Sequence, residues 1–166
     1  MPDIPYGKFR DKGTPIDNLS NYNSSEEQIV FVCDEGSLSM AKLLFATKQG
    51  MLKQVDGSEF QVAKRTIAAT KLLEEDEVIC VQVVTDGQSI VLQTTNGYFL
   101  RFASTEVPEK KKGAVGARGI KLQKKDELEQ VYLLEEGVEQ KVLYKEKEVT
   151  LNRLKLARRD GIGTKR

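Results

Sequence analysis

An internal repeat is the feature of this sequence that most limits how the chain can fold. Residues 46–53 (ATKQGMLK) match residues 93–100 (QTTNGYFL) in their pattern, and the glycines of the two segments, Gly50 and Gly97, are 47 positions apart. Self-similarity at such a period is typical of propeller-like folds, in which each blade takes about 40–50 residues. The repeat therefore predicts several copies of one small β-sheet unit.

The repeat continues downstream with a slightly longer period. Asp76 and Asp126 are 50 positions apart, and so are the turn signals at 86–87 and 136–137. The later copy therefore has three additional residues in its glycine-rich loop. We count two complete repeats and two partial ones, and we expect a single domain, residues 1–166, built from repeats of about 47–50 residues.

Each repeat contains a predicted β-hairpin. The pair Asn96-Gly97 separates two β-rich runs, which predicts a two-residue turn in which both residues have positive φ. Because strand side chains alternate between faces, Tyr98, Phe99 and Phe102 are expected to be mainly core residues and not platforms for stacked bases. No segment keeps a helical period for long, so the sequence predicts an all-β domain. The candidate strands are 28–33, 39–46, 51–55, 78–84, 90–95, 98–102, 131–134, 141–144 and 149–151.

Charge is segregated along the chain although the net charge is only +1. Residues 110–125 contain seven basic side chains and no acidic one, whereas 126–136 contain five acidic side chains and no basic one. If the repeats fold alike, each places its basic, glycine-rich loop at an equivalent position on the rim. Such a stripe suits a polyanion, because binding neutralises phosphates and releases counterions, and glycines allow close approach of the backbone.

Basic residues that recur at equivalent repeat positions are the candidate contacts to such a polyanion. Contacts of this kind to phosphates position a nucleic acid without reading its sequence. Lys124 and Lys125 are expected to be ordinary solvated charges, and the acidic turns 74–77 and 126–129 are expected to be solvated as well. The candidates are Lys64, Arg65, Lys71, Lys110, Lys111, Lys112, Arg118, Lys121, Arg158, Arg159, Lys165 and Arg166.

These motifs resemble the C-terminal domain of the A subunit of bacterial type II topoisomerases, DNA gyrase and topoisomerase IV. The resemblance rests on the paired segments TKQGMLK and TTNGYFLRF, and on the run GAVGARGIKL that precedes Asp126. It covers nearly the whole chain. It implies a β-pinwheel of four-stranded antiparallel blades with exchanged strands, about four in this chain, and bending of duplex DNA around a basic rim. It also implies that catalysis lies elsewhere, in an ATPase partner and in the N-terminal part of the same subunit, within the bacterial cytoplasm at the nucleoid.

One motif departs from the gyrase pattern. Gyrase carries a QRRGGKG box that supports strong wrapping of DNA, and the nearest segment here is 157–163, ARRDGIG. Asp160 replaces a glycine and Ile162 replaces the lysine, and an aspartate in that loop is expected to repel phosphate. The resemblance therefore favours a topoisomerase IV-like role, in which the domain holds or steers a DNA segment without wrapping it tightly.

Two other classes of function are compatible with parts of the sequence. A protein-interaction propeller fits the small net charge and predicts an exposed apolar or mixed patch in place of a continuous basic rim. An enzyme is disfavoured, because the sequence has no histidine, nucleophile motif, phosphate loop or metal-ligand cluster. Cys33 and Cys80 lie in apolar runs and are expected to be buried small hydrophobes. We expect no cofactor in this domain, no signal peptide or membrane segment, and a monomer.

Overall fold

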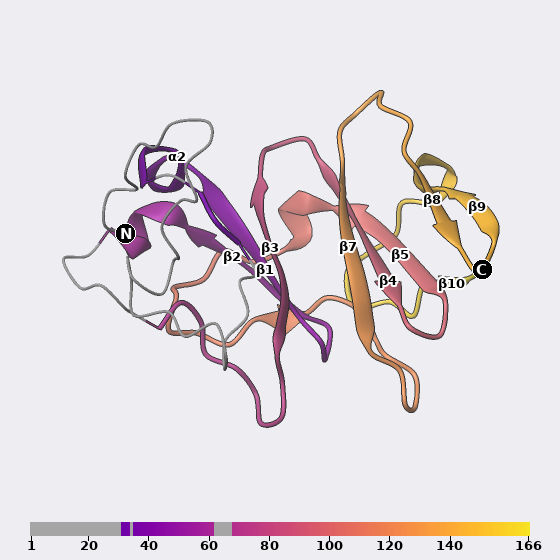
Figure 1. The fold of residues 1–166 in the computed structure, drawn as a ribbon, viewed down its shortest axis with the longest axis horizontal. Coiled ribbons are helices and arrows are strands. Elements are labelled where there is room, and N and C mark those ends of the chain that lie inside the picture. Colours follow the sequence, from indigo (N-terminus) through magenta and orange to yellow (C-terminus); the bar gives the residue numbers. More distant parts are fainter. Residues whose placement is uncertain (1–30, 34, 62–67) are drawn as a thin grey trace, which may run out of the picture.

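Two four-stranded antiparallel sheets and a separate hairpin stand side by side in the computed structural model, which describes residues 31–33, 35–61 and 68–166 (Figure 1). The first sheet has the order β3 (Val78–Val84), β1 (Lys42–Thr47), β2 (Met51–Asp56) and β6 (Ala117–Arg118). The second has the order β7 (Leu128–Leu134), β4 (Ser89–Thr94), β5 (Tyr98–Ala103) and β10 (Thr164–Lys165). The third unit is the hairpin β8 (Lys141–Tyr144) and β9 (Lys147–Thr150).

The two sheets are copies of one unit, and each takes its last strand from a distant part of the chain. β6 follows β5 in sequence but pairs with β2 of the first sheet, through Met51 opposite Arg118. β10 follows the third unit and pairs with β5, through Lys165 opposite Tyr98. Neighbouring blades therefore exchange strands, which confirms the predicted all-β fold of pinwheel type. Of the two partial repeats, the one at residues 1–25 lies outside the described residues, and the third unit has two strands among them.

Alternation along the strands divides the core into three layers. Leu44 and Leu52 of the first sheet pack with Ile90 and Phe102 of the second, in a cluster between the two sheets. Phe99 and its neighbours on the other face of the second sheet pack against the third hairpin, and Leu43, Phe45 and Val55 form a cluster on the other face of the first sheet. Phe99 and Phe102 are thus core residues as predicted, and Tyr98 is half-buried.

Short helices connect the strands. The 3₁₀ helices η1 (Gly57–Phe60), η2 (Ser104–Glu106) and η3 (Leu151–Arg153) each follow the second strand of a hairpin. The α-helix α2 (Glu35–Ser39) was not predicted, and it delays the start of β1 to Lys42, three residues later than expected. Most of the predicted strand 28–33 lies outside the described residues.

The hairpins were predicted correctly, but their turn type was not. The loop between β4 and β5 has three residues: Gly97 N–H donates to Thr94 O at 3.0 Å, and Gly97 has φ +85° while Asn96 keeps a negative φ. The Thr94 hydroxyl accepts the Tyr98 N–H at 3.1 Å, which stabilises the return strand. This is a type I turn followed by a left-handed glycine. A two-residue turn with both residues at positive φ occurs instead at Lys145 and Glu146, which contain no glycine.

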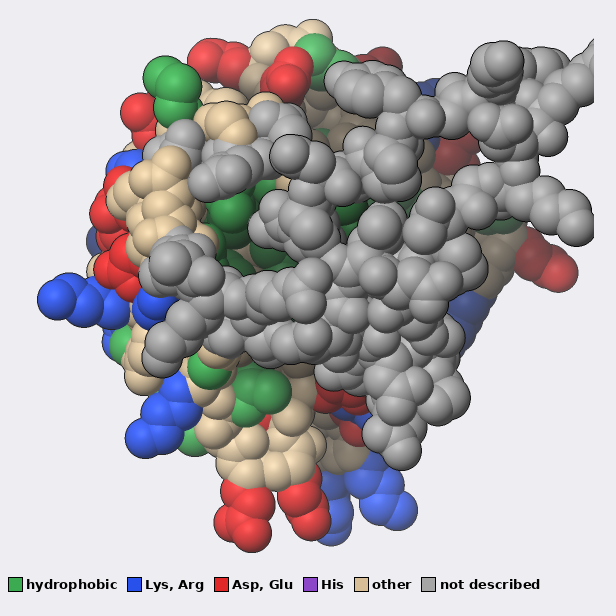
Figure 2. All heavy atoms as spheres, turned by 60° about the vertical axis from the view of Figure 1, so that its left-hand side comes forward, with side chains coloured by type: hydrophobic (Ala, Val, Ile, Leu, Met, Phe, Trp, Pro, Cys, Tyr) green, Lys and Arg blue, Asp and Glu red, His purple; other side chains and the backbone are tan. Residues whose placement is uncertain are grey.

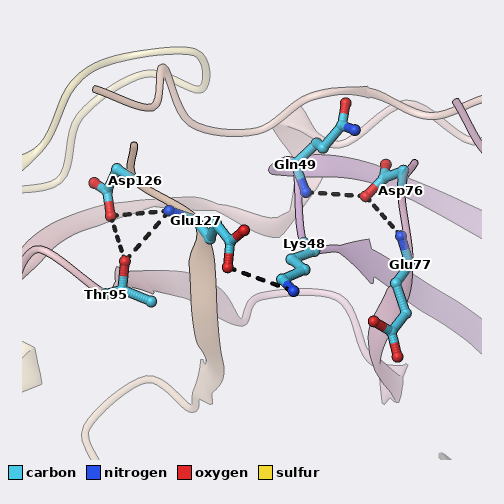
Figure 3. A network of polar contacts seen from close by, with 7 residues as sticks. All are labelled: Lys48, Gln49, Asp76, Glu77, Thr95, Asp126 and Glu127. Carbon is cyan, nitrogen blue, oxygen red and sulfur yellow. Dashed lines mark hydrogen bonds and ion pairs between the residues drawn. The ribbon is translucent and has the colours of Figure 1, made fainter. Parts of the chain in front are cut away.

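The glutamates of the acidic turns are exposed, as expected, but the expectation was wrong for Asp76 and Asp126, which have structural roles. Asp126 is 7% exposed, and its Oδ1 accepts hydrogen bonds from the Thr95 hydroxyl at 2.9 Å and from the Asn96 N–H at 3.0 Å. In the preceding copy, Asp76 Oδ1 accepts the Gln49 N–H at 3.0 Å (Figure 3). Each aspartate thus fastens the tip of the hairpin that precedes it, because a carboxylate can accept several N–H donors at once.

Candidate nucleic-acid interface

Two basic loops occupy equivalent positions on successive blades. We call residues 110–121 the first basic loop and residues 156–166 the second. At its start each loop joins the second strand of a hairpin: Lys110 N–H donates to Gln54 O and Ala157 N–H to Arg101 O, both at 2.8 Å. At its end Gly119 N–H donates to Gly50 O at 2.7 Å, and Arg166 N–H to Gly97 O at 2.9 Å. The expectation that the copies place their basic loops alike is met for these two.

The two basic loops also touch one another. Lys121 N–H donates to Gly161 O and Asp160 N–H donates to Gly119 O, both at 2.8 Å. Ile120 and Gly161 form a parallel bridge. The two backbones are therefore hydrogen-bonded neighbours, and the basic side chains near this junction come from two blades.

The candidate residues differ in how freely their charges reach solvent. Lys165 Nζ lies 5.9 Å from the centre of the Tyr98 ring and is nevertheless exposed. Lys110, Lys112 and Arg159 are half-buried. Lys64 and Arg65 lie outside the described residues. The exposed candidates are Lys71, Lys111, Arg118, Lys121, Arg158, Lys165 and Arg166.

Lys112 and Arg159 fasten the loops to the blades. Glu59 Oε2 accepts the Lys112 N–H at 2.7 Å, and Lys112 Nζ donates to the Glu59 carbonyl at 3.0 Å. Glu106 Oε2 accepts the Arg159 N–H at 2.5 Å, and Arg159 Nε donates to the Glu106 carbonyl at 3.0 Å. The same clasp therefore occurs in both blades, and the two side chains use part of their donor capacity within the chain. The shared spacing of 47 positions, for both the glutamates and the basic residues, is the sequence signal that could have revealed it.

Asp160 is paired and does not stand alone in its loop. Its carboxylate accepts Arg118 Nη2 at 3.0 Å and is also bonded by Arg118 Nε. This bidentate contact lowers the pKa of Asp160 and raises the pKa of Arg118. The predicted repulsion of phosphate by Asp160 is thus accompanied by a second effect, because the aspartate also occupies the guanidinium edge that a phosphate would use.

A buried lysine lies behind the first basic loop and was not anticipated from the sequence. Lys53 is 1% exposed, and its Nζ donates to the carbonyls of Lys112 at 2.9 Å, Ala114 at 2.7 Å and Lys111 at 3.3 Å. Burial lowers the pKa of Lys53. Three carbonyls match the three N–H donors of an ammonium group, which is how a buried cation remains stable.

Figure 2 shows part of the described surface on one face of the molecule. Where described residues are visible there, acidic and basic side chains are interspersed around the edge. Within the described residues, no group of three or more His, Cys, Asp or Glu side chains could hold a metal ion, and no helix has the length and apolarity to cross a membrane. Cys80 is half-buried against the central core and Cys33 is half-buried too, and burial raises the pKa of the Cys80 thiol.

Comparison with known proteins identifies the family. The model of the DNA gyrase C-terminal domain, a β-propeller, matches residues 41–85 and 88–135. This chain belongs to the DNA gyrase C-terminal domain family. It is similar to the A subunit of DNA gyrase from Lawsonia intracellularis, with 35% identity over 135 residues, which are 80% of this chain and 16% of that protein. It is also similar to the A subunit of DNA topoisomerase 4 from Bacillus subtilis, with 30% identity over 128 residues, which are 76% of this chain and 16% of that protein.

A solved structure shares the fold of this gyrase-type domain. The crystal structure of the C-terminal domain of DNA topoisomerase IV superposes with a TM-score of 0.83 at 23% identity, over 95% of this chain and 51% of that one. The chain spans about a sixth of the curated relatives it matches and corresponds to the non-catalytic C-terminal domain of the topoisomerase A subunit. Relatives of both the gyrase and the topoisomerase IV type occur among the matches, so the topoisomerase IV-like character stays a prediction.

Proposed function

We propose that this domain binds duplex DNA along its two basic loops without reading the sequence, and bends it. The observation that carries the proposal is the junction of the two loops, where Lys121 meets Gly161 and Asp160 meets Gly119. This junction brings the two basic loops together, and a duplex that follows them would meet phosphate-binding groups from both blades. Family membership supports the same function, because DNA is the substrate named for the relatives.

The energetics set a requirement on the number of contacts. Smooth bending of a 20–30 bp site costs on the order of 1–6 kcal/mol, and phosphate contacts must offset it. The exposed basic residues of the two loops supply these contacts, and each neutralised phosphate adds about 0.9 to the slope of log affinity against log salt. Binding by this mechanism therefore weakens steeply as salt rises.

In the complete enzyme, we propose that the domain presents a DNA segment to the catalytic part of the same subunit, which works with an ATPase partner. Pairing of Arg118 with Asp160 reduces the positive charge at the loop junction. This supports a topoisomerase IV-like mode, in which DNA is held and steered, over tight gyrase-like wrapping. The proposed setting is the bacterial cytoplasm, with the isolated domain a monomer.

The test is a salt titration of binding to a duplex of several helical turns. The double variant Lys111→Ala with Lys121→Ala removes two exposed charges from the first basic loop and should lower the salt slope by about 1.8. The matched control is Lys145→Asn with Lys147→Ala, which removes two exposed charges from the third hairpin and uses asparagine because Lys145 has positive φ. The control should keep the slope of the unmodified domain.

Two results would contradict the proposal. If both double variants lowered the slope equally, the loops would not be the interface. If the unmodified domain failed to bind the duplex at low salt, direct DNA binding would be excluded for this chain and a protein-interaction role would be favoured. A bound domain that leaves the linking number of relaxed, closed circles unchanged would indicate holding, whereas a shift would indicate wrapping.

A further inference from the structure

We infer that the buried Lys53 is a positioning residue for a phosphate-binding turn, residues 111–114, at the tip of the first basic loop. The inference rests on the proposed function and assigns one part of the interface to specific groups. The ligand is a phosphodiester of the duplex backbone. Lys53 itself cannot be the contact, because its side chain is buried and its Nζ donates to three carbonyls.

The three carbonyl contacts fix the orientation of the turn. In a planar trans peptide the C=O and the following N–H point in opposite directions. The Lys112 carbonyl points at Lys53 Nζ, 2.9 Å away, so the N–H of Gly113 points away from the buried lysine. Gly113 is exposed, and a Cβ placed on it would meet no atom within 4 Å. Within the described residues, the Gly113 N–H has no partner in the protein. It is therefore open to an anion.

The ammonium group of Lys111 is a second donor in the same turn as the Gly113 N–H. Lys111 is exposed and forms no ion pair within the described part of the chain. The turn is closed by the Ala114 N–H, which donates to Lys111 O at 3.0 Å, so Lys111 and Gly113 belong to one rigid turn. A backbone N–H and an ammonium group together are a common way to hold a phosphate.

A glutamate holds the same turn from a different direction. Glu59 Oε2 accepts the Lys112 N–H at 2.7 Å. The turn is thus held by Lys53 through its carbonyls and by Glu59 through one of its N–H groups. Both supports lie within the protein, and neither side chain is free to contact DNA.

The decisive experiment is a double-mutant cycle on DNA affinity with Lys53→Met and Lys111→Ala. Methionine is unbranched and only one atom shorter than lysine, and it removes the three donors. If Lys53 acts through the turn, Lys53→Met should weaken binding at least as much as Lys111→Ala and lower the salt slope by about 0.9, although no surface charge is lost. The double variant should then bind within about twofold of Lys53→Met alone, because interacting sites are not additive.

The reference cycle combines Lys53→Met with Lys165→Ala, which removes an exposed charge on the other blade. In this cycle the fold-losses of DNA affinity caused by Lys53→Met and by Lys165→Ala should multiply. The inference is overturned if Lys53→Met leaves binding unchanged, or if its effect multiplies with that of Lys111→Ala. It is separable from the proposed function, which is tested by DNA binding of the unmodified domain and by the comparison of the two double variants.

A second variant covers the case in which Lys53→Met does not fold. Glu59→Ala removes the other support of the turn and also removes a negative charge, which by itself would strengthen DNA binding. The control Glu136→Ala removes the same charge from an exposed position outside the basic loops. Weaker binding by Glu59→Ala than by Glu136→Ala supports the positioning of the turn, and equal or stronger binding refutes it.

Discussion

Replacement of Gly97 by alanine should destabilise the domain through two separable effects. Gly97 has φ +85°, and an L-residue in the left-handed region costs about 1–2 kcal/mol. An added Cβ would also lie 2.7 Å from Tyr144 Oη and 2.9 Å from Tyr144 Cε1. Overpacking of this kind costs about 1–3 kcal/mol. Together the two effects predict a loss of about 2–5 kcal/mol in the free energy of unfolding.

The matched control separates the two effects. Gly87 has the same φ of +85°, but a Cβ there would meet no atom within 4 Å. Gly87→Ala should therefore cost only the backbone strain of about 1–2 kcal/mol. Urea unfolding monitored by far-UV circular dichroism gives both values, and each kcal/mol should lower Tm by about 2–4 °C for a chain of this size.

A double variant then tests the steric contact itself. Tyr144→Phe removes the hydroxyl nearest to the added methyl group, together with its 3.3 Å hydrogen bond to Thr95 O. Gly97→Ala should cost less in the Tyr144→Phe background than in the unmodified chain. Equal costs for Gly97→Ala and Gly87→Ala would refute the argument that packing of the third hairpin against this turn limits the position.

Three further outcomes follow from the polar contacts. Asp126→Ala should lower the free energy of unfolding by about 1–3 kcal/mol in urea titrations, because the donors at the hairpin tip lose their acceptor. Asp160→Asn should raise DNA affinity and add about 0.9 to the salt slope, because it releases Arg118; an unchanged slope would contradict this. The lowered pKa of Asp160 means that the unfolded chain binds its proton more readily. The contribution of Asp160 to stability is therefore present above the pKa of unfolded aspartate and is lost as pH falls through its folded value, so Asp160→Asn should lose less stability on acidification to pH 3 than the unmodified chain.

The repeat predicted most of the fold because its signals are local and periodic. Gly50 and Gly97 mark hairpin tips, and the β-rich runs around them became β1, β2, β4 and β5. The turn type could not be derived in the same way. Asn96-Gly97 suits a two-residue turn, but Thr94 and Asp126 supply acceptors that favour a three-residue loop. Asp126 is 30 positions from Asn96, and local turn preferences do not include such a partner.

The candidate interface was predicted from charge, and charge alone does not distinguish a solvated lysine from a structural one. Lys53 and Glu59 look like surface residues by composition, since charged side chains are rarely buried. Their partners lie more than 50 positions away, in the first basic loop. Only the exchange of strands brings that loop back beside β2. The side chains that hold the first basic loop were therefore missed, whereas the exposed basic residues of both loops could be named as candidates from charge alone.

The two basic loops share the glutamate clasp but differ in one support, which makes them unequal. The position in the second sheet that corresponds to Lys53 is Leu100, which is buried and lies under Gly161. The second basic loop has no ammonium group behind it at that position. Its Asp160 contacts the first loop, through a backbone hydrogen bond to Gly119 and an ion pair with Arg118. Displacement of the first loop should therefore disturb the second, while changes in the second leave the carbonyl contacts of Lys53 in place. We therefore expect the arrangement of both basic loops to depend on the support that Lys53 gives to the first.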